Sequence, residues 1–482
     1  MTKKEFKRAM QCGLGRCIQE LRSCEDIEKY RDIVLWGCTR NLAYDAQSEG
    51  TRGDYLYQLV KCYPDETPFV DAVILSLKKS AAKSDWDFLQ FCRFLELFAK
   101  EGNQPATDAL HDQYQQMYNL LKQHKKRLPN KFMPVRENFE NLCISIIHLP
   151  ETPENCGKAY LNIAENIGAL IINTAWFHTW DFAWFQECAV DALGKSKISK
   201  LLKQSAKSSE NIKAYMDFLA GEKFVANDHI NYYQKAETIT AAEIYETMQS
   251  NKISDSQNEF PILLAAIMQR KGNGAEAAKL ADYYQKETDI FMRSQLLRLL
   301  ANRYCARLLQ AKTVIEDSMS DNTALRKSAF RALEYMKDDA IRDYALEQLQ
   351  KDGTSENIIY MLANNYRKED YDILVSMIKN LPVTYHEKIS WHGPYSAVLD
   401  MFEKGGAKHP PKELLPYLYE HTLCSCCREY TLREMSRRRM VSRQLLEECQ
   451  YDCNDEIREF AGKRLRGRDC PKDCVNLQTD VR

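Results

Sequence analysis

Residues 321–333, which read DNTALRKSAFRAL, are the stretch of this 482-residue sequence that decides the fold. Ala329 and Leu333 follow Arg326 at intervals of three and seven residues, so all three side chains share one face of a helix. The small side chain of Ala329 permits close approach of a second helix. The polar residues that can cap the helix N-terminus are Asp321, or Asn322 and Thr323. The segment therefore predicts a capped amphipathic helix that packs closely on a neighbour.

The same arrangement recurs through the C-terminal half at a nearly constant spacing. The positions that correspond to Arg326 in each copy are Pro261, Arg293, Arg326, Ile359, Pro394, Arg428 and Arg458. Successive positions lie 32, 33, 33, 35, 34 and 30 residues apart. A period near this length corresponds to one helix–turn–helix unit, which buries its apolar face only by stacking on neighbouring units. We therefore predict an array of helical hairpins.

The two clearest copies carry a resemblance to a known family. Residues 321–333 and 452–465 resemble the second helix of HEAT repeats, particularly the short variety. The resemblance covers roughly residues 255–470, and it implies an all-α fold: an α-α superhelix, or right-handed solenoid of helical hairpins, like HEAT and armadillo proteins. Tetratricopeptide repeats have the same period, but their Trp, Leu-Gly and Tyr landmarks are missing at matching positions.

The N-terminal half has helical periodicity without a repeat length. Phe88, Phe91, Leu95 and Phe98 fall on one helical face, for example. We expect residues 1–250 to form a helical domain of diverged repeats, with a distinct helical domain as the alternative. We expect the HEAT-like array over residues 251–470, followed by a short C-terminal tail over residues 471–482.

Composition supports long helices in a soluble protein. Only 18 Gly and 14 Pro occur, which is few for a chain that needs many tight turns. The 67 Lys and Arg residues nearly balance the 68 Asp and Glu residues, so a basic excess typical of nucleic-acid binding is missing. The N-terminus has no signal-peptide pattern, and no apolar run approaches the length of a membrane span. We therefore expect a cytoplasmic protein with no membrane contact.

A first candidate binding site is the polar stretch over residues 40–55, which separates two apolar helices. Its charged side chains could form a ligand or partner site, and they are Arg40, Asp45, Glu49, Arg52 and Asp54. Polar residues are also the norm in loops between helices. We favour a structural role, in which Asp54 caps the following helix and Arg40 pairs with Asp45 across a turn.

A second candidate is an aromatic run with three tryptophans within nine residues, at positions 176, 180 and 184. A continuous helix would place them on one face, either as a recognition surface or as part of the core. We favour the core, because aromatic stripes at helical spacing usually pack inside. The candidate binding residues of this run are Trp176, His178 and Trp180, and no nucleophile stands at a readable spacing from His178.

A third candidate is a cluster of seven cysteines within 51 residues near the C-terminus. They are Cys424, Cys426, Cys427, Cys449, Cys453, Cys470 and Cys474. Zinc favours cysteine ligands, but we interpret the spacings as unlike those of zinc knuckles and expect neither a metal nor another cofactor. Several of these side chains are expected to fill small core positions in the last repeats.

Three functions remain open from the sequence. We favour a non-catalytic scaffold that binds another protein or peptide on the concave surface of the array. The alternative is a nucleic-acid-binding protein related to the HEAT-like DNA alkylation repeat glycosylases, which would use basic runs near Lys122 and near Arg433. A second alternative is a metal- or redox-responsive regulator that uses the C-terminal cysteines.

Overall fold

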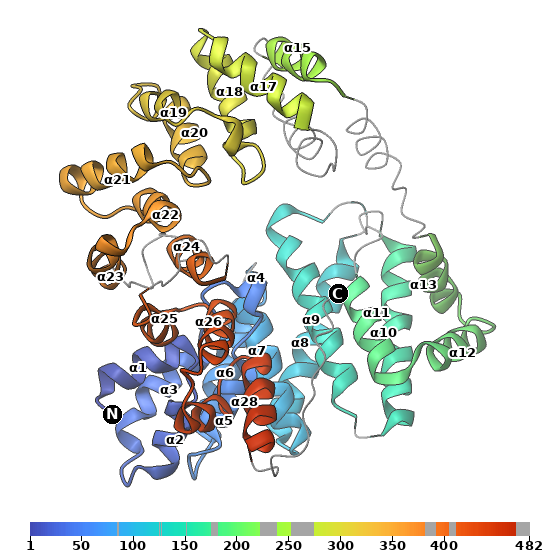
Figure 1. Ribbon diagram of the computed structural model, residues 1–482. Helices are drawn as coiled ribbons and strands as arrows, with labels where there is room; N and C mark the ends of the chain where they lie inside the picture. Colours follow the sequence, from blue (N-terminus) through green and yellow to red (C-terminus); the bar gives the residue numbers. More distant parts are fainter. Residues whose placement is uncertain are drawn as a thin grey trace. The chain divides into compact units, whose positions relative to one another are not determined.

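The computed structural model describes residues 1–83, 86–124, 126, 128–150, 152–174, 182–221, 239–251, 274–380, 392–403 and 411–468. Every regular element in these ranges is a helix, and they contain no strand (Figure 1). The predicted all-α class is therefore confirmed. Among the helices in these ranges, none combines the length and apolar character that crossing a lipid bilayer requires.

The chain divides into two compact units. Unit 1 comprises residues 1–224, 423–432 and 439–482, and unit 2 comprises residues 225–422 and 433–438. The sequence predicted a single boundary near residue 250, with everything up to residue 470 in the array. In the structure the described helices after residue 442 instead belong with the N-terminal half.

Unit 1 is built from thirteen N-terminal α-helices and from helices near the C-terminus. The N-terminal ones are α1 (Lys3–Cys12), α2 (Arg16–Ser23), α3 (Arg31–Cys38), α4 (Ala46–Glu49), α5 (Gly53–Val60), α6 (Thr67–Ser80), α7 (Trp86–Lys100), α8 (Gln104–Gln123), α9 (Met133–His148), α10 (Pro153–Asn173), α11 (Ala183–Leu193), α12 (Lys195–Ser205) and α13 (Glu210–Gly221). The C-terminal ones are α27 (Arg443–Cys449), α28 (Asp455–Arg468) and the first part of α26 (Ser425–Arg437).

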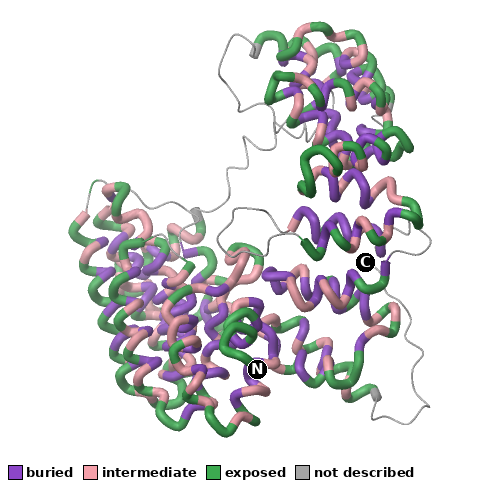
Figure 2. Tube along the Cα trace, turned by 90° about the vertical axis from the view of Figure 1, so that its left-hand side faces the viewer, coloured by how far each residue is buried: buried purple, intermediate pink, exposed green. Residues whose placement is uncertain are grey.

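Helix α7 is the centre of the N-terminal part of unit 1, where it packs on α5, α6, α8 and α9. Its apolar face is the one that the sequence predicted, and Phe88, Phe91, Leu95 and Phe98 are all buried. Figure 2 shows buried residues along the helices of each unit. Burial of four such side chains contributes roughly 1.5 to 3 kcal/mol each, so this face of α7 stabilises the packing of the helices around it.

The described part of unit 2 is a succession of helices. They are α15 (Ala241–Asn251), α17 (Gly274–Lys286), α18 (Ile290–Leu300), α19 (Ala311–Ser318), α20 (Thr323–Leu333), α21 (Asp339–Asp352), α22 (Glu356–Asn365), α23 (Tyr371–Lys379), α24 (His392–Glu403) and α25 (Leu414–His421). Neighbours in sequence pack as α17 with α18, α19 with α20 and α21 with α22. Helices two apart also pack: α18 on α20, α20 on α22, α22 on α24, α19 on α21 and α23 on α25.

The best copies of the recurring sequence arrangement share a hydrogen bond that the sequence analysis did not foresee. Arg293, Arg326 and Arg458 each lie in the first turns of a helix and donate from Nη1 to the backbone carbonyl six residues earlier. The acceptors are the carbonyl oxygens of Glu287, Ser320 and Asp452, at 3.1, 2.9 and 2.6 Å respectively. The residues that cap these helices, each four positions before the arginine, are Asp289, Asn322 and Asn454. The recurrence therefore has a structural basis in the loop before each helix.

The first two helices of unit 1 pack directly against its C-terminal helices. Cys453 N donates to the carbonyl of Gly13 at 2.9 Å, and Arg16 Nε forms an ion pair with Glu448 at 2.8 Å. Gly13 lies in the turn between α1 and α2 with a φ of 74°, a conformation that favours glycine. A Cβ atom at this position would overlap the Cys453 side chain. The α1–α2 turn and the loop before α28 therefore approach each other so closely at Gly13 that only glycine fits there.

Candidate functional site

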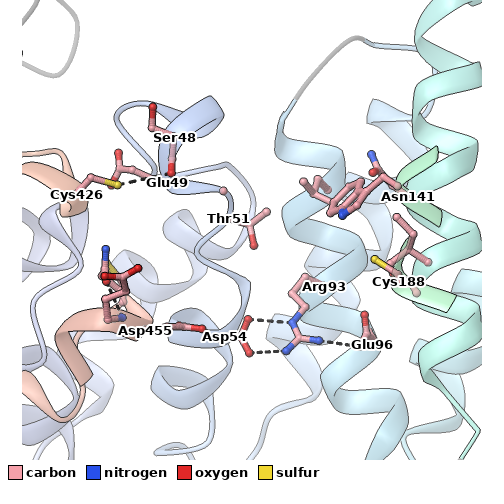
Figure 3. A pocket seen from close by; sticks show the side chains of 18 of the residues that line it. Ser48, Glu49, Thr51, Asp54, Arg93, Glu96, Asn141, Cys188, Cys426 and Asp455 are labelled. Atoms are coloured by element: carbon pink, nitrogen blue, oxygen red, sulfur yellow. Dashed lines mark hydrogen bonds and ion pairs between the residues drawn. The ribbon is translucent and has the colours of Figure 1, made fainter. Parts of the chain in front are cut away.

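Unit 1 contains a hollow of about 570 Å³, which we call the acidic hollow (Figure 3). Its walls come from the α4–α5 connection, α7, α9, α11, the start of α26 and the start of α28. The lining residues are Ser48, Glu49, Gly50, Thr51, Asp54, Leu89, Arg93, Glu96, Asn141, Ile144, Ser145, His148, Trp184, Cys188, Cys426, Glu429, Tyr430, Cys453, Asn454, Asp455 and Glu456. Segments some 400 residues apart in the sequence therefore form one surface.

Six carboxylates line the acidic hollow against a single guanidinium group. The carboxylates are those of Glu49, Asp54, Glu96, Glu429, Asp455 and Glu456, and the guanidinium is that of Arg93. Three further cations pair with these carboxylates from just outside the lining, and they are Arg52, Lys100 and Arg458.

Glu49 forms a rigid part of the wall. Its side chain is fully buried and accepts from Arg52 Nη2 at 2.6 Å, from the backbone N–H of Ser425 at 2.7 Å and from that of Asp45 at 2.8 Å. Arg52 is also buried and donates to Cys453 Sγ through Nη1. Glu49 is therefore held from three sides, and it joins the α4–α5 connection to the start of α26.

Arg93 binds two carboxylates of the acidic hollow, those of Asp54 and Glu96. It contacts Asp54 through two hydrogen bonds of 2.9 and 2.7 Å and Glu96 through one of 2.7 Å. Burial alone would raise the pKa of Asp54, but hydrogen bonding and charge from Arg93 outweigh it and hold that pKa below its ordinary value. Glu96 is 2% exposed; burial opposes its ionisation, while His148, Arg93 and Lys100 lower its pKa overall. Both carboxylates are therefore ionised at neutral pH.

The rim of the acidic hollow is exposed. The Asp455 side chain is 86% exposed at the first turn of α28, where it pairs with Arg458, and Glu456 beside it is also exposed. Tyr430 on α26 is 56% exposed. These side chains are reachable by a partner in solution, in contrast to Glu49 and Glu96 below them.

A smaller hollow of about 270 Å³ adjoins the acidic hollow and shares Leu89, Asn141 and Trp184 with it. Its remaining lining residues are Trp86, Glu137, Asn138 and Glu140. Trp86 and Trp184 are 48% and 45% exposed, which is unusual for side chains that normally bury most of their surface. Exposed indole rings beside carboxylates form an environment that attracts cations.

Cysteine and histidine side chains, which some enzymes use in covalent catalysis, line the acidic hollow. Cys188 and His148 both line it, and His148 Nδ1 lies 3.6 Å from Glu96. Burial and the nearby carboxylates of Asp191 and Glu140 raise the pKa of the Cys188 thiol. A thiol with a raised pKa stays protonated at neutral pH and is a weak nucleophile. The Cys188 thiol is therefore not activated for nucleophilic attack.

The polar stretch over residues 40–55 is divided between structural and lining roles. Glu49 and Asp54 line the acidic hollow, and Arg52 stands directly behind it. The predicted roles of Arg40 and Asp54 were wrong in detail. Arg40 Nε donates to the carbonyl of Trp36 at 3.0 Å and its guanidinium lies over the Trp36 ring instead of pairing across the turn. Asp54 lies inside α5 and pairs with Arg93, because α5 already begins at Gly53.

Asp45 has a local structural role. It is the N-cap of the one-turn helix α4, and its side chain accepts from the backbone and hydroxyl of Ser48, the latter at 2.7 Å. An aspartate in this position satisfies an N–H group that the short helix leaves free.

Only part of the aromatic run lies within the described residues. Trp176, His178 and Trp180 lie outside the described residues. Helix α11, which carries Trp184, begins at Ala183, directly after Phe182 with a φ of 67°. The expectation that Trp184 packs in the core was wrong, since this side chain lines both hollows and is exposed.

Sequence reasoning missed most of the site. It did not identify Arg93, His148, Tyr430 or Asp455, which lie on four different helices. One signal was present: Asp455 and Glu456 form an acidic pair directly after the capping residue Asn454. That pair was interpreted only as part of a repeat, because the sequence does not show which wall α28 faces.

The second basic run is largely paired with acidic side chains. Arg437 and Arg438 both bind Glu434 at 2.9 Å, and Arg443 binds Glu447 at 3.0 Å. In the first run, Lys125 and Arg127 lie outside the described residues. Ion pairs along a helix are the ordinary arrangement of a solvated face.

Five of the seven clustered cysteines are described, and all five are free thiols. Cys424 and Cys449 are buried, whereas Cys426, Cys427 and Cys453 are partly exposed. Cys424 and Cys427 have two residues between them, a Cys-x2-Cys spacing that the sequence analysis overlooked. Burial raises the pKa of Cys453 to about 12, although Arg52 and Arg428 act in the opposite direction. Cys470 and Cys474 lie outside the described residues.

No protein-family model matches this chain, and no curated protein matches it.

Proposed function

We propose that this chain is a non-catalytic scaffold and that unit 1 binds a basic, extended segment of another protein in the acidic hollow. The observation that carries the proposal is the lining of six carboxylates against one guanidinium, with exposed tryptophan alongside. A volume of about 570 Å³ suits a few side chains of a peptide rather than a folded domain. The occupant that fits is a short lysine- or arginine-rich segment.

The carboxylates of the acidic hollow differ in how deeply they are buried, and this difference supports different roles in binding. Glu49 and Glu96 are held by their own cations and form a fixed part of the wall. Asp455 and Glu456 are exposed and can pair directly with an incoming cation. Because rim charges lie in water, each such pair contributes about 0.2 to 1 kcal/mol, and their main effect is on orientation and association rate.

Trp184 can add an apolar contact with the peptide to the ion pairs formed by the rim carboxylates. Its indole is 45% exposed between the two hollows, and it can stack on the guanidinium of an arginine or the stem of a lysine. Exposed tryptophans at binding surfaces often contribute about 2 kcal/mol or more when truncated. The arginine-rich form of the peptide is therefore expected to bind more tightly than the lysine-rich form.

We further infer that unit 2 is a HEAT-like solenoid. Packing of helices with their neighbours and with helices two positions away is the pattern expected for stacked hairpins. The shared bond from Arg293 and Arg326 to the carbonyl six residues earlier supports equivalent repeats. The free thiols among the described cysteines fit a reducing, cytoplasmic location.

Nucleic acid is the weaker alternative for this surface. Phosphate would meet the carboxylates of the acidic hollow, and like charges repel. The second basic run is held by Glu434 and Glu447 within its own helices. Both observations support a protein partner.

Binding of a fluorescent arginine-rich peptide of about ten residues to the full chain, measured by anisotropy, tests the proposal. We expect the affinity to fall with added salt, because the contact is largely between exposed charges. Trp184→Ala should weaken binding about tenfold or more. The double change Asp455→Asn and Glu456→Gln should weaken it about three- to tenfold.

The matched control removes two exposed carboxylates far from the hollow in the sequence, those of Asp282 on α17 and Glu347 on α21. The Asp282→Asn, Glu347→Gln protein has the same net charge as the rim variant and should bind like the wild type. Equal binding of an acidic peptide of the same length, or unchanged binding by the Trp184 and rim variants, would show that the proposal is wrong.

A further inference from the structure

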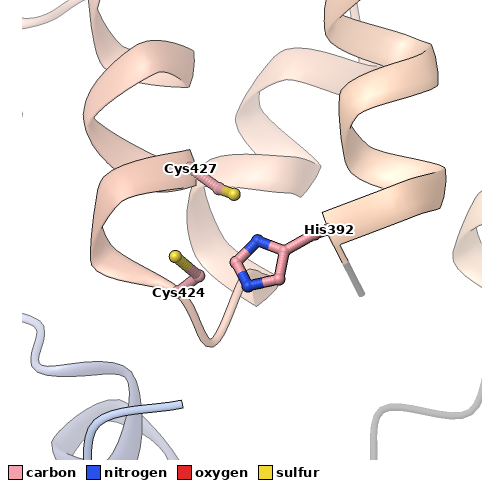
Figure 4. A group of neighbouring side chains, drawn as sticks. All are labelled: His392, Cys424 and Cys427. Atoms are coloured by element: carbon pink, nitrogen blue, oxygen red, sulfur yellow. The ribbon is translucent and has the colours of Figure 1, made fainter. Parts of the chain in front are cut away.

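Cys424 and Cys427 lie at the beginning of α26, and the two residues between them give a spacing that is common among zinc ligands (Figure 4). Both cysteines belong to unit 1, whereas His392, which Figure 4 also draws, belongs to unit 2. Two thiols are fewer ligands than the three or four that zinc usually takes from a protein. The smaller hollow beside the acidic hollow has a fuller set of binding groups within one unit.

The smaller hollow, of about 270 Å³, is formed by three helices of unit 1. Helix α9 packs on both α7 and α11 and supplies the polar part of the lining. Trp86 is the first residue of α7, and Trp184 lies in the first turn of α11. Each of these two helices therefore adds one tryptophan to a hollow whose polar groups come from the helix that both contact.

Both indole rings of the smaller hollow are accessible to a ligand. Trp86 is 48% exposed and Trp184 is 45% exposed. The ring of Trp36, by comparison, already has two cations of the chain over it, those of Lys7 and Arg40, at 4.3 and 4.5 Å from the ring centre. Within the described part of the chain, no such cation lies over Trp86 or Trp184. The faces of these two rings can therefore receive a cation from outside the chain.

Two carboxylates of α9 make the smaller hollow negative. Glu137 is exposed and Glu140 is half-buried, and the lining contains no lysine or arginine. Glu140 accepts the backbone N–H of Phe185 at 3.0 Å, at the start of α11. This bond offsets the partial positive charge of a helix N-terminus, which would otherwise repel a cation. Among the described residues no ion pair involves Glu137, so its carboxylate can face an incoming positive charge.

These features fit a methylated ammonium group better than an ordinary lysine. A lysine ammonium is compact and strongly hydrated, and its three N–H donors favour oxygen acceptors. Methylation replaces those donors by apolar methyl groups that still carry positive charge, and such a group binds to aromatic faces, best of all to tryptophan. A volume of about 270 Å³ is just below the range of about 300 to 1,000 Å³ that is usual for small-molecule pockets, so it suits one compact head group.

We propose that the smaller hollow binds a methylated ammonium group against the indole rings of Trp86 and Trp184, with Glu137 as the neighbouring negative charge. The group can come from a methylated lysine of a peptide or from a free quaternary ammonium compound. Because Trp184 also lines the acidic hollow, one basic peptide can reach both hollows. The peptide source rests on the proposed function, whereas binding of a free ammonium compound does not.

Titration of the full chain with choline, followed by tryptophan fluorescence, tests the proposal. The comparison compound is 3,3-dimethyl-1-butanol, which has the same shape as choline without the charge. We expect saturable binding of choline, about fivefold or more tighter than that of the uncharged compound. Trp86→Ala should lower the choline affinity about fivefold or more. Glu137→Gln should lower it about two- to fivefold, because this carboxylate is exposed.

Two fluorescent arginine-rich peptides, identical except for trimethylation of one lysine, distinguish the two sources. If the source is a methylated lysine, the trimethylated peptide should bind about fivefold or more tighter, and Trp86→Ala should remove most of this preference. Equal affinities of the two peptides, together with binding of choline, would assign the hollow to a free ammonium compound. Failure of both peptides to bind would contradict the proposed function, and the choline titration would still decide the present proposal.

Tyr335→Ala is the matched control, since it removes an aromatic side chain of similar exposure, 42%, from unit 2. This variant should bind choline like the wild type. Circular dichroism verifies that each variant is folded, which we expect because Trp86 and Glu137 are exposed. Absence of saturable choline binding, equal affinity for the uncharged compound, or a choline affinity that is unchanged in Trp86→Ala would overturn the proposal.

Discussion

Arg428 and Asp452 form a completely buried, two-point ion pair in unit 1. Arg428 Nε and Nη2 donate to the two carboxylate oxygens at 3.1 and 2.8 Å, and both side chains have no exposed surface. The remaining nitrogen, Nη1, donates to the carbonyl of Cys12 at 2.6 Å. One guanidinium group therefore links α26 and the loop before α28 to the end of α1, which lies more than 400 residues earlier in the sequence.

Loss of this guanidinium should destabilise the protein strongly. Arg428→Met removes the partner of a buried carboxylate, and an uncompensated buried charge costs about 3 to 5 kcal/mol. Urea unfolding of the variant, followed by circular dichroism, measures the free energy of unfolding. Arg443→Gln is the control, because its pair with Glu447 is mostly exposed and should contribute less than about 1 kcal/mol. Equal losses in the two variants would show that the buried pair has no special role.

The turn between α1 and α2 should not tolerate a side chain. Gly13→Ala combines a positive φ with overlap on Cys453. The conformational cost alone is about 1 to 2 kcal/mol, and the overlap should add to it. Gly102 also has a positive φ, of 89°, and closes a helix with the same pattern of backbone hydrogen bonds, but nothing lies within 4 Å of a Cβ built there. Thermal unfolding should therefore show a larger loss for Gly13→Ala than for Gly102→Ala. A loss of the same size would contradict the close approach.

The recurring arginine bond should contribute measurably to stability. Arg326→Gln removes the bond to the carbonyl of Ser320 at 2.9 Å, and a charge-assisted bond of this kind is worth about 1.5 to 3 kcal/mol. Arg331→Gln on the same helix changes an exposed arginine and should have little effect. Chemical unfolding of both variants measures the difference. If Arg331→Gln is as destabilising as Arg326→Gln, the bond from Arg326 to the Ser320 carbonyl makes no specific contribution to stability.

The stability of unit 2 should depend on the ionisation of Glu334. Burial, and then the nearby charge of Glu356, raise the pKa of Glu334 to about 7. The folded state therefore retains this proton more strongly than the unfolded chain, whose glutamates titrate near pH 4.3. By linkage, the free energy of unfolding falls as the pH rises between those two values.

Glu334→Gln removes this pH dependence. The variant should match the wild type near pH 4 and exceed its stability by about 1 to 3 kcal/mol at pH 8. Urea unfolding at a series of pH values gives the comparison. Glu347→Gln, at an exposed position on α21, is the control. A difference between Glu334→Gln and the wild type that stays constant with pH would contradict the assigned pKa.

The helical fold could be predicted because its signal is local. The face formed by Phe88, Phe91, Leu95 and Phe98 is visible within a single helix, and burial confirms it. The copies at Arg293 and Arg326 likewise lie within single helices, α18 and α20. The assignment of α27 and α28 to unit 1 could not be predicted in this way. It depends on contacts such as Cys453 with Gly13, for which a helical period carries no information.

The candidate site was beyond sequence reasoning for the same physical reason. Glu49 and Asp455 line one hollow although they are about 400 residues apart in the sequence. Each has an ordinary local role: Glu49 ends the short helix α4, and Asp455 begins α28. Trp184 was assigned to the core because its spacing matched a helix, but that helix begins only at Ala183. Exposure depends on the neighbouring helices, which the spacing does not specify.

The most direct test of the proposed function is to locate the bound peptide on the full chain. An arginine-rich peptide with one photoreactive residue is cross-linked at physiological salt, and mass spectrometry identifies the attached residues. The account predicts adducts on the walls of the acidic hollow, at Tyr430, Trp184 and the first turn of α28, with a lower yield of these adducts in the Asp455→Asn, Glu456→Gln protein. Adducts confined to unit 2, or unchanged in that variant, would contradict it.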